Sequence, residues 1–295
     1  MPPAEVDIAE PLVQQLLDQQ HPDLAHLHIV PLAHGWDNVM FRLGSHYTLR
    51  FPRRATAVPL ILNEHRWLGQ LARSTAVPVP APLRYGAPSP AFQWPWSIGP
   101  WLDGVALLGI PVADRGAVAV ELADFVADIH HEAPADAPRN PVRGTPLQAR
   151  DRAFRDRLRL PGMPKPAAVL AFWEQSLAAE VFSGPAQWLH GDLHPGNILV
   201  HDGHLSAVVD FGDMGRGDPA TDLAAAWLAF DAPARKVFMD QVTARCGTDA
   251  ASWLRARGWA LNMATALLAQ SDNHPPLRAL GEHTVAQIVS GARVP

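Results

Sequence analysis

Two short segments near residue 200 contain the side chains best suited to chemistry. The first is HGDLHPGNIL at residues 190–199, and the second is VVDFGD at residues 208–213. Between them, Asp202-Gly203 predicts a tight hairpin turn, because such turns need positive φ angles. The sequence therefore predicts a polar loop, two short strands and a second polar segment.

Oxygen-bearing side chains lie at both outer ends of this hairpin. A hairpin brings its outer ends together, so Asn197 and Asp210 are predicted to emerge side by side. An amide carbonyl and a carboxylate suit Mg²⁺, which binds through few protein ligands, several waters and substrate phosphates. Asp192, earlier on the same loop, is free to accept a hydroxyl proton. Phosphoryl transfer requires this combination of metal and carboxylate.

The same residues match two signatures of protein kinases. His190, Asp192 and Asn197 have the spacing of the kinase catalytic loop, and Asp210-Phe211-Gly212 matches the metal-binding triplet. His190 is a candidate catalytic residue whose expected role is to brace the loop by hydrogen bonding. A protein substrate is disfavoured, because the N-terminal part lacks a glycine-rich triplet and a helix start at Asp218 leaves no long activation segment.

A competing interpretation is a zinc site built from the histidines of this region, which are His190, His194, His201 and His204. Such spacing gives a zinc site when the histidines share one helix face. Pro195 and Gly196 disfavour a helix here. The sequence therefore favours Mg²⁺ over zinc, with His201 and His204 flanking the turn.

The elements that position these groups change along the chain from strands to helices. Short alternating runs between Leu27 and Phe51 predict three antiparallel strands. Helical spacing predicts helices over residues 12–17 and 60–71, and the proline-rich stretch 77–100 favours extended structure. Later helices are predicted over residues 118–129, 169–182, 218–230 and 252–270. Strands first and helices afterwards predict an α+β fold with two lobes.

Composition excludes several classes of protein. The 295 residues are 48% hydrophobic and 18% charged, which is typical of an ordered globular chain. A net charge of −5 with scattered Lys and Arg argues against nucleic-acid binding. No secretory signal or membrane span is expected. Because Cys246 is the single cysteine, an internal disulfide is excluded and a reducing cytoplasm is the simplest location.

These motifs resemble those of the aminoglycoside phosphotransferase family, which also includes macrolide kinases. The resemblance extends to four further segments, GWDNVMFRL at 35–43, TLRFPRR at 48–54, ADFVADIHH at 123–131 and GDPATDLA at 217–224. It implies a bilobal, protein-kinase-like fold. A small antiparallel-sheet lobe is expected at residues 1–99, a hinge at 100–104, and a helical lobe with the substrate pocket at 105–295.

The resemblance also implies roles for individual residues. Asp192 would be the catalytic base, and Asn197 and Asp210 would hold Mg²⁺. The turn over the nucleotide phosphates would comprise Gly35, Trp36, Asp37 and Asn38. The purine would lie against the backbone at residues 98–101, which includes Trp101.

One position departs from the family pattern. The usual third-strand lysine, which pairs with a helix glutamate and holds the nucleotide phosphates, is replaced by Arg50, with Glu64 as its expected partner. Arginine binds phosphate bidentately where lysine acts as a point charge. Arg53 and Arg54 are alternative candidates for the phosphate contact.

By resemblance, the chain is a kinase that transfers the γ-phosphate of ATP or GTP to a hydroxyl of an aminoglycoside or a macrolide. The alternatives are a metabolite kinase acting on choline, homoserine or a sugar, and a catalytically weak nucleotide-binding regulator suggested by the missing lysine. Carboxylates that would attract an amine-bearing acceptor are Asp213, Asp231 and Asp272. Neither a nucleic acid nor a membrane is expected as a partner, and the oligomeric state is open.

Overall fold

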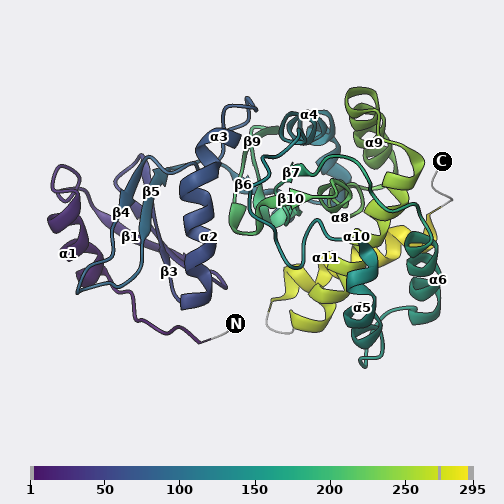
Figure 1. Cartoon of the computed structure of the whole chain (residues 1–295), viewed down its shortest axis with the longest axis horizontal. Helices are drawn as coiled ribbons and strands as arrows, with labels where there is room; N and C mark the ends of the chain where they lie inside the picture. The colour runs from purple at the N-terminus through teal and green to yellow at the C-terminus, as the bar shows by residue number, and fades with distance from the viewer. Residues whose placement is uncertain (1–2, 272–273, 292–295) are drawn as a thin grey trace. The chain divides into compact units, whose positions relative to one another are not determined.

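The chain folds into two compact units, described here from a computed structural model (Figure 1). The structure describes residues 3–271 and 274–291, with the side chains of Ala33 and His34 left aside. Unit 1 consists of Met1–Ser74, Pro78–Leu102 and Asp210–Gly212. Unit 2 consists of Thr75–Val77, Asp103–Val209 and Asp213–Pro295.

Unit 1 is built around a five-stranded antiparallel sheet with strand order β1-β2-β3-β5-β4 (Figure 1). Its strands are β1 (Ile29–His34), β2 (Asn38–Leu43), β3 (Tyr47–Pro52), β4 (Arg84–Gly86) and β5 (Trp96–Pro100). The first three strands are the antiparallel set predicted from the sequence, which is confirmed. Arg50 is paired with Met40 on one side and with Ser97 on the other, so it lies in the interior of the sheet.

One face of this sheet carries the core of unit 1. Because side chains alternate along a strand, Leu49 and Phe51 point into the core while Arg50 points to the opposite face. The helix α1 (Glu10–Gln20) packs its buried leucines against the same core. Phe51 stacks on Trp96 with ring centroids 5.0 Å apart. The polar side chain of Arg50 therefore lies on the face of the sheet opposite this core.

A single helical segment supplies Glu64 to unit 1. It runs through α2 (Val58–Asn63), a π-helical turn (Glu64–Leu68) and α3 (Gly69–Leu71). The helix predicted over residues 60–71 is confirmed, but its π-helical turn was not foreseen. Such turns occur mostly as isolated bulges and are frequent at functional sites.

Unit 2 is mainly helical. Its helices are α4 (Ala119–Ile129), α5 (Asp151–Leu158), α6 (Pro166–Leu177), α7 (Ala220–Leu223), α8 (Ala225–Ala229), α9 (Ala232–Cys246), α10 (Ala250–Gln270) and α11 (Pro275–Ser290). The long helix α10 packs against α5, α6, α7, α8 and α11, so it forms the centre of this unit (Figure 1).

Two small sheets in unit 2 frame the motif segments. One has the order β6 (Val105–Ala106), β8 (Ile198–His201) and β9 (His204–Val208), and the other pairs β7 (Gln187–Leu189) with β10 (Gly215–Gly217). The hairpin predicted from the sequence is present as β8 and β9, with Ile198 opposite Val208. Its turn residues have positive φ angles, 50° at Asp202 and 81° at Gly203.

Two predicted helices have different bounds in the structure. The helix expected over 169–182 ends at Leu177, and the next residues are irregular where Arg255 binds the carbonyl oxygen of Glu180. The helix expected over 218–230 is two short helices, α7 and α8, whose residues are all buried. A helix buried on every side lacks the apolar stripe that periodicity detects. The helices α5, α9 and α11 were not predicted.

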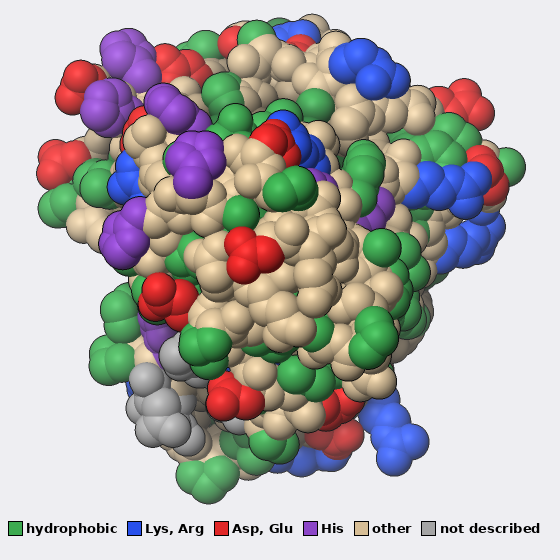
Figure 2. All heavy atoms as spheres, turned by 90° about the vertical axis from the view of Figure 1, so that its left-hand side faces the viewer, with side chains coloured by type: hydrophobic (Ala, Val, Ile, Leu, Met, Phe, Trp, Pro, Cys, Tyr) green, Lys and Arg blue, Asp and Glu red, His purple; other side chains and the backbone are tan. Residues whose placement is uncertain are grey.

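The surface of unit 1 is rich in histidine. Figure 2 shows histidine side chains gathered at one side of the face in view, with acidic side chains both among them and elsewhere on this face. The exposed histidines described in unit 1 are His26, His28 and His46.

Within the described residues, no helix combines the length and apolar character needed to cross a membrane.

Candidate active site

The loop between β7 and β8, residues 190–197, is held in place by the buried carboxylate of Asp222. Asp222 on α7 accepts hydrogen bonds from the backbone N–H groups of His190 and Gly191, each 2.8 Å long. Its second contact is with His130, whose Nε2 lies 3.1 Å from Oδ2. Asp222 is fully buried. The sequence indicated only a structural helix residue here and gave no sign of this link to the loop.

His190 connects the loop to the end of the hairpin. Its Nδ1 accepts a hydrogen bond from the backbone N–H of Asp192 at 3.2 Å, so its Nε2 is the donor to the carbonyl oxygen of Val209 at 2.9 Å. The N–H of Val209 donates in turn to the carbonyl oxygen of Asn197 at 2.9 Å. The buried ring of His190 thus joins two backbone segments and lies on the inner side of the loop.

The loop also requires a glycine. Gly191 has a φ angle of 89°, a conformation that favours glycine. A Cβ atom at this position would lie 2.2 Å from the carbonyl oxygen of Asp213, which is inside van der Waals contact. The close approach of Asp213 to the loop therefore depends on the absence of a side chain at residue 191.

Asp192 has a partly exposed side chain that faces two cationic or polar groups. Its Oδ1 lies 2.6 Å from Nη2 of Arg143, and its Oδ2 lies 3.4 Å from Nε2 of His194. Burial raises the pKa of Asp192, but Arg143 and then His194 lower it further, so its pKa lies well below the usual range. Asp192 is therefore ionised at neutral pH.

Arg143 reaches Asp192 from the proline-rich loop before α5, and the sequence did not single it out. Its Nε lies 3.3 Å from Oδ2 of Asp213. Asn140 on the same loop donates to Oδ1 of Asp213 at 2.8 Å and accepts from the backbone N–H of Arg143 at 3.1 Å. Nothing in the sequence of this loop signalled the contact with Asp192.

Two of the three carboxylates expected to attract an amine already have hydrogen-bond partners within the protein. Asp213 is not free for a ligand, because it is bonded to Asn140 and Arg143. Asp231 caps α9 by accepting a hydrogen bond from the N–H of Ala234 at 3.0 Å. Asp272 lies outside the described residues. Neither Asp213 nor Asp231 is therefore an unpaired acceptor for a cation.

The two residues expected to hold Mg²⁺ have oxygen atoms suited to the task. Asn197 donates from Nδ2 to the carbonyl oxygen of Asp192 at 3.0 Å, which leaves Oδ1 without a hydrogen-bond donor in the described part of the chain. Asp210 directly follows Val209, the residue bonded to Asn197. Its side chain is 60% exposed, and its φ angle of 63° is a strained value for a non-glycine residue. One amide and one carboxylate oxygen fit Mg²⁺.

The histidines considered for zinc are not gathered into a metal site. In residues 3–271 and 274–291, no cluster of three or more His, Cys, Asp or Glu has a geometry that would hold a metal ion. His201 and His204 flank the hairpin turn, and Nδ1 of His204 contacts Glu121 at 2.8 Å.

Arg50 is the centre of the polar cluster in unit 1. Its Nη1 lies 2.9 Å from Oε1 of Glu64, so the ion pair predicted from the sequence is present. Its Nη2 lies 3.1 Å from Oδ1 of Asp210. With its amide oxygen turned toward Arg50, Asn38 accepts from Nε at 3.0 Å and from Nη2 at 2.9 Å. Burial raises the pKa of Glu64 to about 7 against the opposing effect of Arg50.

The two neighbouring arginines hold the turn between β1 and β2. Arg53 donates to the carbonyl oxygen of Gly35 at 2.9 Å, and Arg54 forms an ion pair with Asp37. Trp36 at the tip of this turn is 48% exposed. Of the three candidate arginines, Arg50 is the one paired with the helix glutamate, whereas the other two fix the turn.

The backbone expected to face a purine is largely engaged within unit 1. The N–H of Trp101 donates to the carbonyl oxygen of His46 at 2.7 Å, and the carbonyl oxygen of Ile98 accepts from Leu83 at 2.8 Å. The ring of Trp101 lies under the guanidinium of Arg42 at 4.1 Å. These two groups are engaged within unit 1, and the expectation that backbone groups of 98–101 meet a purine stays a prediction.

Comparison with known families identifies the chain at this point. The model of the phosphotransferase enzyme family, APH, matches residues 28–259. The chain belongs to this family. The resemblance stated from the sequence is confirmed, and the protein is a phosphotransferase by family. No curated protein matches the chain.

Solved structures share the fold at low sequence identity. The GDP complex of wild-type aminoglycoside 2′-phosphotransferase-IIIa is 16% identical with a TM-score of 0.68, over 96% of this chain and 99% of that one. The apoenzyme of macrolide 2′-phosphotransferase MphH from Brachybacterium faecium is 22% identical with a TM-score of 0.62, over 92% and 97%. A thermostable mutant of APH(4)-Ia, in a ternary complex with AMP-PNP and hygromycin B, is 18% identical with a TM-score of 0.63, over 96% and 99%. The predicted α+β fold is confirmed.

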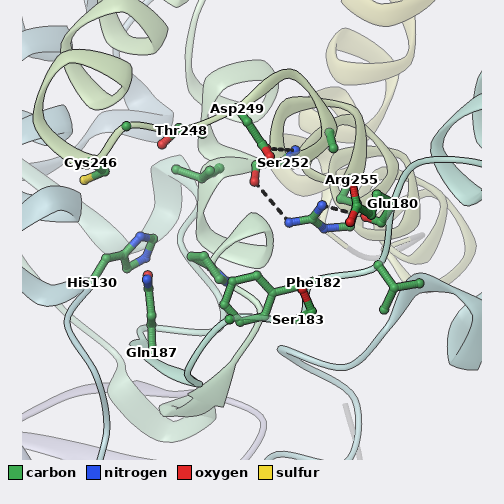
Figure 3. A pocket seen from close by; sticks show the side chains of 16 residues that line it. His130, Glu180, Phe182, Ser183, Gln187, Cys246, Thr248, Asp249, Ser252 and Arg255 are labelled. Carbon is green, nitrogen blue, oxygen red and sulfur yellow. Dashed lines mark hydrogen bonds between the residues drawn. The ribbon is translucent and has the colours of Figure 1, made fainter.

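Unit 2 of this phosphotransferase also contains a cavity of about 300 Å³ (Figure 3). His130 and Gln187 lie on one side of it, and Ser252 and Arg255 lie on another. Arg255 donates to Ser252 and to the carbonyl oxygen of Glu180, so its charge is already engaged in the wall. Among the described residues that line the cavity, none was predicted to bind nucleotide, metal or acceptor.

Proposed function

We propose that this phosphotransferase transfers the γ-phosphate of ATP or GTP to a hydroxyl of an antibiotic-like acceptor, an aminoglycoside or a macrolide, in a reaction that requires Mg²⁺. The observation that carries the proposal is Asp192, an ionised and partly exposed carboxylate on a loop whose backbone is fixed by Asp222. The acceptor class is supported by similar structures, which include a complex with hygromycin B and a macrolide 2′-phosphotransferase.

Asp192 acts on the acceptor hydroxyl. Its carboxylate accepts a hydrogen bond from that hydroxyl and aims the oxygen at the γ-phosphorus. The new bond joins the acceptor oxygen to phosphorus. The bond from phosphorus to the bridging oxygen breaks, and its electron pair leaves with the nucleoside diphosphate. The hydroxyl proton passes to Asp192 and then to water. Because the pKa of Asp192 is low, its carboxylate takes the proton late in the reaction. The main contribution of Asp192 is therefore to orient the acceptor hydroxyl.

Asn197 and Asp210 are the proposed ligands of Mg²⁺, through the amide oxygen of one and the carboxylate of the other. When bound there, the ion neutralises charge on the nucleotide phosphates. His190 positions both ends of this region through its bonds to Asp192 and Val209. It does so without touching substrate, since its ring is buried.

The nucleotide phosphates are assigned to Arg50 and to the turn of Gly35, Trp36, Asp37 and Asn38. Glu64 and Asn38 fix the guanidinium of Arg50 in one plane, so a phosphate meets a donor that needs no reorganisation. The purine is assigned to the surroundings of Trp101, through its side chain and not through its engaged N–H.

A nucleotide-consumption screen tests the proposal. The purified protein is assayed with ATP and with GTP, with and without Mg²⁺, against aminoglycosides, macrolides, choline, homoserine and simple sugars. Asp192→Asn protein from the same preparation procedure is the control for contaminating kinases. Turnover is expected with an aminoglycoside or a macrolide and only with Mg²⁺.

Three other results would overturn parts of this proposal. Turnover with a metabolic alcohol and with neither antibiotic class would replace the acceptor and make the protein a metabolite kinase. Thermal stabilisation by nucleotide without turnover on any acceptor would make it a nucleotide-binding regulator. Turnover that is independent of Mg²⁺ would remove the roles given to Asn197 and Asp210.

A further inference from the structure

Arg255 and Arg143 are two of the arginines of unit 2 that bind aspartate, and they differ in how many of their side-chain donors are engaged. Arg255 is 6% exposed, and all three of its nitrogens donate, to Asp218, to Ser252 and to the carbonyl oxygen of Glu180. Arg143 is 19% exposed and donates from Nε and Nη2. Its Nη1 has no acceptor in the described part of the chain. Arg255 is saturated by the fold, whereas Arg143 keeps a donor unused.

The carboxylate that Arg143 binds is Asp192, the residue at which the acceptor oxygen must arrive. Arg143 occupies Oδ1 at 2.6 Å, while Nε2 of His194 lies 3.4 Å from Oδ2, beyond normal hydrogen-bond length. Oδ2 is therefore the oxygen open to an acceptor hydroxyl. A hydroxyl bonded to Oδ2 would share the carboxylate of Asp192 with the guanidinium of Arg143.

The loop that carries Arg143 is fixed on both sides of the residue. Asn140 accepts from its backbone N–H and also binds Asp213, the second partner of its side chain. The next residue, Gly144, donates to Oγ1 of Thr221 at 3.0 Å and accepts from the N–H of Asp218 at 3.0 Å. A donor held in this way needs no rearrangement when charge develops nearby, which is the condition for effective electrostatic catalysis.

We propose that Arg143 is a catalytic residue whose free Nη1 binds the phosphoryl group during transfer, while Nη2 holds Asp192 in position. This inference rests on the proposed kinase function and deepens it. As the bond to the bridging oxygen breaks, negative charge is spread over the three equatorial oxygens of the phosphoryl group. The planar guanidinium offers parallel donors to a carboxylate and to such an oxygen at once, which an ammonium group does not. No bond to Arg143 forms or breaks.

The decisive experiment compares Arg143→Ala and Arg143→Lys with Arg139→Ala, which changes an exposed arginine on the same loop. Three quantities are measured with Mg²⁺: kcat with the best acceptor of the screen, or with water where none is found, KM for nucleotide, and Tm with and without nucleotide. For Arg143→Ala we expect kcat to fall about 10²–10³-fold, with KM for nucleotide within about threefold of the wild type. Arg139→Ala is expected to match the wild type.

Two further measurements separate this role from a structural one. Guanidinium chloride at millimolar concentration is expected to restore part of the kcat of Arg143→Ala and none of the kcat of Asp192→Asn. Arg143→Lys keeps the positive charge, so its Tm is expected to equal that of the wild type while kcat falls about 10-fold or more. This variant decides the matter where Arg143→Ala is too unstable to assay.

The failures are distinguishable. If the wild type consumes no nucleotide with any acceptor or with water, the proposed function fails and takes this inference with it. If the wild type is active and Arg143→Ala and Arg143→Lys both keep kcat within threefold, only the role of Arg143 is overturned. A loss confined to KM for nucleotide, or a Tm lowered in proportion to kcat in both variants, also overturns it.

Discussion

Each unit of the molecule contains a short arginine–carboxylate pair, and the two pairs have opposite electrostatic outcomes. In unit 1, Arg50 and Glu64 are 2.9 Å apart, and in unit 2, Arg143 and Asp192 are 2.6 Å apart. The pKa of Glu64 is raised to about 7, whereas that of Asp192 is lowered. The carboxylate side chains are 2% and 27% exposed, respectively.

The difference shows that a nearby guanidinium does not by itself set the charge of a carboxylate. The loss of solvation raises the pKa of Glu64 by more than the attraction of Arg50 lowers it. Asp192 also loses solvation, but it keeps some water contact and gains a second favourable neighbour in His194. Glu64 is thereby suited to holding an arginine in place, and Asp192 to meeting a substrate. The following experiments test this division, in order of expected effect.

The largest effect is expected for Asp192→Asn. Loss of the base should lower kcat by about 10²–10⁴-fold, because the amide orients the acceptor poorly and takes no proton. Nucleotide affinity and Tm should stay near the wild-type values. Steady-state kinetics and thermal unfolding check both expectations, with Asp240→Asn on the exposed face of α9 as the matched control. Full activity in Asp192→Asn would remove the distinction between the two pairs.

Asp222→Ala should cause the largest loss of stability. The change leaves the buried N–H groups of His190 and Gly191 without an acceptor and His130 without its partner. Breaking a buried charged network of this kind costs about 3–5 kcal/mol. Urea unfolding measures the loss, and Asp240→Ala is the control. A change below about 1 kcal/mol would show that the loop does not depend on this carboxylate.

Glu64 should make stability depend on pH in the opposite sense from an ion-paired carboxylate whose pKa is lowered on folding. Its pKa rises from 4.5 to about 7 on folding, so the folded state binds a proton that the unfolded state releases in this interval. Its contribution to the free energy of unfolding is therefore complete below pH 4.5 and falls as pH rises toward 7, by roughly 1–3 kcal/mol. Urea unfolding between pH 5 and 8 should show this slope in the wild type and lose it in Glu64→Gln. Equal slopes in both proteins would contradict the raised pKa.

The smallest effect is expected from two glycine substitutions that separate backbone strain from steric clash. Gly203→Ala places a Cβ in open space at a φ angle of 81°, and should cost about 1 kcal/mol. Gly191→Ala has a similar φ angle but meets the carbonyl oxygen of Asp213 at 2.2 Å, so it should cost about 2 kcal/mol and also disturb Arg143 through Asp213. Equal Tm values for the two variants would mean that Asp213 moves freely.

The sequence predicted the parts of the fold that depend on local rules. The hairpin followed from Asp202-Gly203, since a two-residue turn with positive φ angles is a local property. The strands of unit 1 followed from alternation, and the pairing of Arg50 with Glu64 from the family pattern. The helix predicted over residues 218–230 covers α7 and α8, but the break between them did not follow, because residues buried on all sides show no period.

The missed residues of the site are those positioned by long-range contacts. Arg143 comes from an irregular loop, and nothing local to that loop indicates that its side chain ends at Asp192. Asp222 was interpreted as a residue of the first turn of a helix, and its bonds to His190 and Gly191 appear only when α7 is placed beneath the loop. Such contacts arise from tertiary packing, which the spacing of residues along the chain does not encode.

Unit 1 is assembled from segments that lie far apart in the sequence. Asp210–Gly212 belongs to unit 1 although more than a hundred residues separate it from Leu102 in the chain. A single recombination event near residue 103 would therefore combine Arg50 from one parent with Asp210 from the other. Because these two side chains meet at 3.1 Å, a change at either position is constrained by the other across that distance in the gene. Substitutions at Arg50 and Asp210 are therefore expected to depend on one another.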